Sequence, residues 1–217
     1  MRPIAKIKIA GAVITAFLLI PSATAFSQHP PLYMKPTNAG SHWSSFENLN
    51  GAHGNAAKEN KGGKGHAWDS IAPGETKTLM DAKGAGMITR MWLTIDDRST
   101  ETLRSLRLDM FWDNVEKPAV SVPFGDFFNA MLTEPTRYEN ELFSTGEGRS
   151  FNCFIPMPFH KSGKVTLTNE TKKPLKHLFY DIDYVLDKDL PADALYFHSH
   201  WHRSLSLIHI SEPTRPY

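Results

Sequence analysis

The sequence predicts an all-β fold, a jelly-roll sandwich, on three observations. Apolar and polar residues alternate with a period of two in several short segments, and no long helical pattern is present. Aromatic residues are plentiful (13 Phe, 6 Tyr, 5 Trp), and 14 Gly and 15 Pro supply many turns. Alternation of this kind is typical of strands that bury one face, and several such strands separated by turns favour a sandwich.

The first 25 residues have the organisation of a secretory signal peptide. Basic residues in 2–8 precede an apolar run over 9–20, and Ala23 and Ala25 form a small-x-small cleavage site. The apolar run has about 12 residues whereas a membrane span needs about 20, so a membrane anchor is the weaker interpretation. We therefore predict a secreted or periplasmic protein with no membrane contact after signal cleavage.

The charge and the cysteine content exclude other classes. Removal of residues 1–25 takes away three positive charges and changes the formal net charge from +1 to −2. A near-neutral surface gives no electrostatic reason to expect a nucleic-acid partner. The single cysteine, Cys153, lies in the apolar stretch FNCFIP, so we predict a small buried residue in a domain stabilised by its core alone.

An irregular region precedes the predicted strands. Residues 26–43 form a Pro-rich, extended lead-in, and residues 41–75 are rich in Gly, Asn, Lys and His, which predicts a long surface loop. The glycines and lysines of this loop do not fit a phosphate-binding loop. Lys58 stands where that pattern needs Gly, and Gly65 stands where it needs Ser or Thr.

Four segments then show strand periodicity, and Asp113-Asn114 supplies a turn after the second. The predicted apolar faces are Met91, Leu93 and Ile95; Leu106, Leu108, Met110 and Trp112; Val165 and Leu167; and Leu178, Tyr180, Ile182, Tyr184 and Leu186. We expect most of the five Trp residues to lie in the core as well, although they could also form a platform for carbohydrate.

Three patterns could carry chemistry. His198, His200 and His202 would share one face of a strand and could bind a metal ion, but no carboxylate lies nearby in sequence to orient a ring. Asp181 and Asp183 share a strand face at a spacing compatible with a glycosidase pair, although a solvated face is the better interpretation. Asp126, between Gly125 and two Phe residues, suits either sugar binding or a turn at a strand end.

Several specific segments occur in a fixed order along the chain: SSFENLNG, APGETKTLMDAKGAGMITRMWLT, LRLDMFWDN, SVPFGDFF, GRSFNCFIPMPFHKSGKVTLTNE, YDIDY and YFHSHWHR. NCFIPMPF and PFGDFF are the most specific pieces. Together these segments resemble glycoside hydrolase family 172, the former domain of unknown function 2961, from about Ser44 to Arg203.

The resemblance implies a double jelly-roll subunit that assembles into trimers or hexamers, of which residues 44–204 would be the first, incomplete jelly roll. It implies activity on arabinofuranosyl or fructofuranosyl linkages of oligo- or polysaccharides by a retaining mechanism. One Glu would be the nucleophile and another the acid/base, with no cofactor. Those glutamates lie in Gly-Glu-Gly-Asp-Glu and Gly-Thr-Glu-Asp segments, which this sequence does not contain. No catalytic residue is therefore carried over.

The resemblance also suggests residues for a substrate pocket. Asp126, Phe127, Asn152 and His198 match family motifs, and Trp201 lies beside the last of them. Of the three histidines, only His198 is typical of the family pattern, which weakens the metal interpretation.

Residues 205–217 are expected to carry no function. LSLIHISEPTRP is similar to the translation of a transposase-type sequencing adapter, and the family resemblance stops just before it. We therefore expect the natural chain to continue after Arg203. Three hypotheses follow: part of an exported furanoside hydrolase, inactive alone; a non-catalytic carbohydrate-binding or structural jelly roll; and a metal-dependent jelly-roll enzyme.

Overall fold

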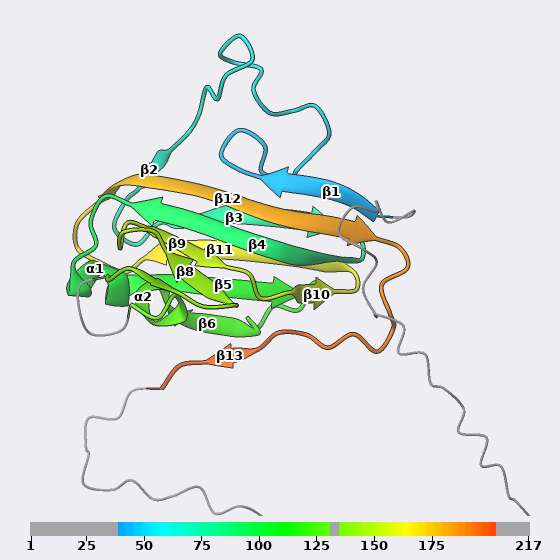
Figure 1. The fold of residues 1–217 in the computed structure, drawn as a ribbon. Helices are drawn as coiled ribbons and strands as arrows, with labels where there is room; N and C mark the ends of the chain where they lie inside the picture. Colours follow the sequence, from blue (N-terminus) through cyan, green and yellow to red (C-terminus); the bar gives the residue numbers. More distant parts are fainter. Residues whose placement is uncertain (1–38, 131–134, 203–217) are drawn as a thin grey trace, which may run out of the picture. The chain divides into compact units, whose positions relative to one another are not determined.

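Two β-sheets form a sandwich in the computed structural model, which describes residues 39–130 and 135–202 (Figure 1). The predicted signal peptide, most of the lead-in and the tail over 205–217 lie outside the described residues. An eight-stranded sheet contains β1 (Ala39–Ser44), β2 (Asp69–Ile71), β4 (Gly86–Ile95), β7 (Tyr138–Glu139), β8 (Phe143–Thr145), β9 (Ser150–Cys153), β10 (Met157–Phe159) and β12 (Leu175–Asp187). A five-stranded sheet contains β3 (Thr76–Lys83), β5 (Leu106–Trp112), β6 (Val120–Pro123), β11 (Ser162–Asn169) and β13 (Ser199–His200).

The chain passes repeatedly from one sheet to the other, as in jelly rolls. Strands β3 and β4 lie in different sheets, as do β4 and β5, and β11 and β12. Two short helices, α1 (Thr100–Ser105) and α2 (Phe124–Phe127), occupy connections at one end. The prediction of an all-β sandwich is confirmed. Among the described residues, no helix has the length and apolar character that a bilayer crossing requires.

The core lies between the two sheets and contains the predicted apolar faces. Leu93, Leu108, Val165 and Ile182 are fully buried, in agreement with the alternation in their segments. Strand β11 differs from the prediction, because its polar face is also buried, with Thr166 only 5% exposed. Its central position contributes: β11 pairs with β3 on one side and β5 on the other, so side chains of both neighbours flank its threonines, as the Thr76 hydroxyl does that of Thr168 at 2.8 Å.

The predicted turn at Asp113-Asn114 is confirmed. The backbone N–H of Val115 donates to the carbonyl of Trp112 at 3.1 Å. Asp113 and Asn114 both have positive φ, 57° and 63°. Positive φ at both central residues is the signature of a type I′ turn, in which Asn and Asp are favoured.

The prediction of a loop over 41–75 is wrong near its two ends, which belong to β1 and β2, and the prediction that most Trp residues lie in the core is also wrong. β1 is an edge strand whose pairing with β12 supplies the order that local composition does not indicate. Of the five Trp residues, Trp112 is the buried one, while Trp43 and Trp68 are 36% and 45% exposed. The stretch between β1 and β2 is irregular, as predicted, and projects away from the sandwich at the top of Figure 1.

Candidate functional site

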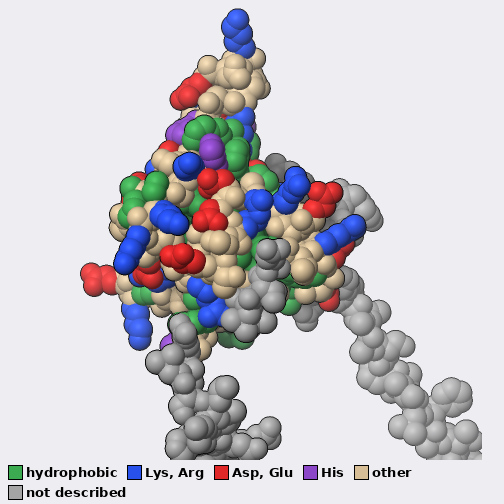
Figure 2. Space-filling model, turned by 90° about the vertical axis from the view of Figure 1, so that its left-hand side faces the viewer, with side chains coloured by type: hydrophobic (Ala, Val, Ile, Leu, Met, Phe, Trp, Pro, Cys, Tyr) green, Lys and Arg blue, Asp and Glu red, His purple; other side chains and the backbone are tan. Residues whose placement is uncertain are grey.

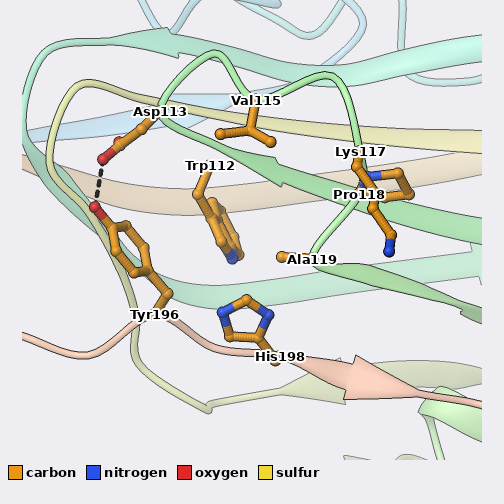
Figure 3. A pocket seen from close by; sticks show the side chains of 8 residues that line it. All are labelled: Trp112, Asp113, Val115, Lys117, Pro118, Ala119, Tyr196 and His198. Carbon is orange, nitrogen blue, oxygen red and sulfur yellow. Dashed lines mark hydrogen bonds between the residues drawn. The ribbon is translucent and has the colours of Figure 1, made fainter.

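A solvent-open groove of about 390 Å³ lies between the turn after β5 and the segment leading into β13 (Figure 3). Trp112, Val115, Pro118 and Ala119 supply an apolar lining. The polar groups come from Asp113, Lys117, Tyr196 and His198. A largely apolar hollow with a few polar groups at its rim is the usual form of a small-ligand site.

The floor of the groove is fixed to the C-terminal segment. Trp112 is 4% exposed and its ring stacks in parallel with that of Phe159, at a centroid distance of 6.3 Å. Its indole N–H donates to the carbonyl of Phe197 at 2.8 Å. This bond ties the segment that carries Tyr196 and His198 to strand β5, so both sides of the groove are held in place.

Asp113 holds the rim of the groove together. Its Oδ1 accepts backbone N–H groups of His160, Lys161 and Ser162 at 2.9, 2.6 and 3.2 Å. Its Oδ2 accepts the hydroxyl of Tyr196 at 2.5 Å (Figure 3). Burial acts to raise the pKa of Asp113, but these hydrogen bonds outweigh it and hold the pKa below its ordinary value. The carboxylate is therefore occupied by the fold.

The groups that remain for a ligand are His198 and Lys117. His198 is exposed, and Figure 3 shows its ring below the indole of Trp112. Lys117 lies on the other side of the groove, beside Pro118 (Figure 3). An imidazole and an ammonium placed around an aromatic floor can hydrogen-bond the hydroxyls of a small polar ligand.

Three of the predicted site residues meet at the segment that carries His198: Trp201 belongs to it, while Asp126 and Phe127 come from α2. The ring of Phe127 is 7% exposed and meets that of Phe197 edge to face, with centroids 6.4 Å apart. Asp126 Oδ2 lies 2.7 Å from Arg104 Nε, and the Arg104 guanidinium lies 5.9 Å from the ring centroid of Trp201. Asp126 and Trp201 thus meet through Arg104, and the Asp126 carboxylate serves an ion pair.

Asn152 lies elsewhere, on strand β9 of the eight-stranded sheet. It pairs in register with Trp92, and its amide donates to the carbonyl of Ser144 at 3.4 Å. The five predicted residues therefore do not line one pocket. Cys153, which follows Asn152 in the sequence, is a buried free cysteine, and its burial was predicted.

The three histidines do not form a metal centre in the described part of the chain. His198, His200 and His202 are exposed and alternate with the partly buried Phe197, Ser199 and Trp201, as a shared strand face requires. Among the described residues, however, no group of three or more His, Cys, Asp or Glu side chains is close enough to hold a metal ion. Only Ser199 and His200 form strand β13.

The sequence did not indicate that Tyr196 and Lys117 line the groove, or that Asp113 holds its rim together. The Asp113-Asn114 pair indicated a turn, but its hydrogen bonds to Tyr196 and to residues 160–162 join parts of the chain that are far apart in sequence. The YF pair that precedes HSHWH was the available signal, since Tyr196 lines the groove and Phe197 holds the Trp112 indole.

Charged side chains of both signs are interspersed on the face of the molecule at the β2 and α1 end (Figure 2). Where described residues form this face, they show no extended basic patch of the kind that binds a nucleic-acid backbone.

A family model described as GH172 domain-like matches residues 66–182, just over half of the chain. The matched residues include strands β2 to β11 and the first part of β12. They also include the Asp113-Asn114 turn that forms one side of the groove. No curated protein matches the sequence.

Proposed function

The chain belongs to the GH172 family, and on that premise we propose that it is part of an exported glycoside hydrolase that acts on arabinofuranosyl or fructofuranosyl linkages. The observation that carries this proposal is the family match over residues 66–182. Hydrolysis would be retaining, with two glutamates from segments that this sequence does not contain. A longer parent protein would supply them.

The described residues would serve this enzyme as scaffold and as part of the substrate site. The groove offers an aromatic floor at Trp112 and hydrogen-bonding groups at His198 and Lys117. A furanose presents C–H groups on one side and hydroxyls around its edge, which is the chemistry that such a lining recognises. Asp126 and Trp201, joined through Arg104, would support the segment that carries His198.

The test begins with the source DNA, sequenced across codon 203 with long reads. The parent protein, if its frame continues into both glutamate segments, is then assayed on arabinan and fructan oligosaccharides. We expect release of arabinose or fructose, and loss of release in each Glu→Gln variant. A parent protein with both glutamates that releases no sugar would contradict the proposal.

Export and assembly follow as separate proposals. We expect mature protein from the native host to begin at Phe26, which N-terminal sequencing checks. We expect a trimer or hexamer of the parent protein, which light scattering during size-exclusion chromatography checks.

A non-catalytic carbohydrate-binding domain is the second candidate function. The observation in its favour is that Asp113, the carboxylate that lines the groove, and Asp126, the predicted sugar-binding carboxylate, are both engaged in contacts that hold the fold. Titration of the chain with arabino- and fructo-oligosaccharides, followed by Trp fluorescence, tests it. Saturable binding, together with a genuine stop codon after this sequence, would favour it over the hydrolase.

A further inference from the structure

The outer face of the eight-stranded sheet carries a second group of aromatic and charged side chains. Tyr180, Ile182 and Tyr184 of β12 are buried in the core, so Asp181 and Asp183 between them face outward. The pairing of β12 with β4 places Asp181 opposite Trp92 and Asp183 opposite Arg90. The pairing of β1 with β12 places Trp43 opposite Asp183, and that of β4 with β9 places Asn152 opposite Trp92.

We call this group the outer-face cluster. It consists of Trp43, Lys64, Arg90, Trp92, Asn152, Asp181 and Asp183, contributed by β1, β4, β9, β12 and the loop between β1 and β2.

The charges in the outer-face cluster balance. Asp181 lies 3.0 Å from Lys64 Nζ, and Asp183 lies 3.2 Å from Arg90 Nη1. The four side chains are between 22% and 40% exposed, so solvent reaches both pairs. Because two carboxylates face two cations, the cluster has no net formal charge. It therefore suits a neutral ligand that both donates and accepts hydrogen bonds better than an ion of either sign.

Asp183 contrasts with the carboxylates at the groove. Among the described residues, Arg90 is the one cationic side chain within ion-pair distance of it. Burial, which outweighs the effect of Arg90, and the neighbouring Asp181 raise the pKa of Asp183 above its ordinary value. With Arg90 as its one ion-pair partner among the described residues, the Asp183 carboxylate keeps acceptor positions that a ligand hydroxyl can use.

Lys64 covers an aromatic ring of the cluster. Its Nζ lies 5.0 Å from the ring centroid of Trp43 while bonded to Asp181. The backbone next to Lys64 is anchored, because the carboxylate of Glu47 accepts the N–H groups of Gly65 and of His66, the latter at 2.9 Å. A ligand on the Trp43 ring would displace the long Lys64 side chain, and the anchored backbone would keep its ammonium near that ligand.

From these contacts we propose that the outer-face cluster binds a neutral oligosaccharide, at a site separate from the groove. Trp43 and Trp92 would cover the apolar faces of sugar rings, as aromatic side chains do in sugar sites. Asp181 and Asp183 accept hydroxyl protons, while Arg90, Asn152 and the displaced Lys64 donate to hydroxyl oxygens. This site goes beyond the hydrolase proposal, since it needs neither of the two glutamates.

The experiment is calorimetric titration of the full chain with neutral arabino- and fructo-oligosaccharides. We expect Trp43→Ala and Asp183→Asn each to weaken binding about tenfold or more, since each removes a direct contact. Trp68→Ala is the matched control: Trp68 is 45% exposed but packs on His177, outside the cluster. Its affinity should not change.

Three results would overturn the proposal. One is unchanged affinity in both Trp43→Ala and Asp183→Asn. Another is an equal loss in Trp68→Ala. The third is absence of binding to the unaltered chain. The groove variant His198→Ala separates this proposal from the hydrolase proposal: if only that variant loses affinity, the outer-face site is wrong while the groove keeps its role. Folding of each variant is checked by its near-UV circular dichroism.

Discussion

The groove and the outer face of the eight-stranded sheet both carry carboxylates, but the two regions use them differently. At the groove, Asp113 accepts three backbone N–H groups and the Tyr196 hydroxyl, and its pKa is lowered. On the sheet face, Asp183 meets the flexible side chain of Arg90, and its pKa is raised. A carboxylate bound to backbone serves the fold, whereas one bound to movable side chains can exchange them for a ligand.

The largest expected effect is a difference in thiol reactivity, and it tests which face of β9 is exposed to solvent. Asn152→Cys should react quickly with a thiol reagent in the native protein, while Cys153 should not. Burial raises the pKa of Cys153 from an ordinary 9.0 to about 12. Its thiolate is then about a thousandfold rarer at a given pH. Timed labelling with mass spectrometry measures both rates, and fast reaction of Cys153 in the native state would contradict the assignment of faces.

The next effect tests whether Asp113 serves the fold. Asp113→Ala should lower the free energy of unfolding by about 3 kcal/mol, because three N–H groups lose their acceptor and Ala tolerates positive φ poorly. Asp113→Asn keeps an acceptor oxygen and a residue that tolerates positive φ, so it should cost about 1 kcal/mol. Urea unfolding measures both, and equal costs would show that the acceptor oxygen is unimportant.

The lowered pKa of Asp113 also predicts a pH dependence. Its contribution to stability is present above the unfolded-state pKa and is lost as the pH falls through the native pKa. The stability difference between the unaltered chain and Asp113→Ala should therefore shrink in acid. Denaturant unfolding across the acid range checks this, and a difference that grows in acid would have the wrong sign.

A smaller effect is expected at Asp126. Its side chain is 12% exposed and that of Arg104 is 26% exposed, so removal of the carboxylate leaves a partly buried guanidinium. Asp126→Ala should cost about 2 kcal/mol in unfolding free energy. If Asp126 bound sugar directly, the Asp126→Ala variant would lose oligosaccharide affinity even under conditions where it stays folded. Titration of the folded variant therefore distinguishes the two roles.

The smallest effect is expected at Asp183. Because its pKa is raised, its contribution to stability is full below the unfolded-state pKa and is lost as the pH rises through the native pKa. Asp183→Asn should remove that dependence. Solvent screening at this partly exposed group keeps the change at neutral pH below about 1 kcal/mol. A large loss of stability would instead show that Asp183, like Asp113, is needed to hold the fold.

More of the fold than of the candidate site could be predicted from the sequence. The period-two alternation around Leu93, Leu108 and Ile182 is local, and it identified strands β4, β5 and β12. Strand β1 was missed because its order comes from pairing with β12, well over a hundred residues later.

Site geometry depends on such distant pairings throughout. The strand order β12-β4-β9 brings Asp181, Trp92 and Asn152 into one row, and no local pattern contains that order. The Asp126 motif was recognised, but its ion pair with Arg104 is a tertiary contact, so the sequence did not indicate that the carboxylate was engaged. The predicted solvated face at Asp181 and Asp183 agrees with their partial exposure, but the sequence did not indicate that each carboxylate forms an ion pair.

The most direct test of the outer-face site is an NMR titration of the five Trp indole N–H signals with a neutral arabino- or fructo-oligosaccharide. Assignment by single Trp→Phe variants makes each signal a reporter of its own region. We expect the signals of Trp43 and Trp92 at the outer face to shift and the signal of Trp68 to stay unmoved. Shifts confined to Trp112 and Trp201 at the groove side, or no shifts at all, would contradict it.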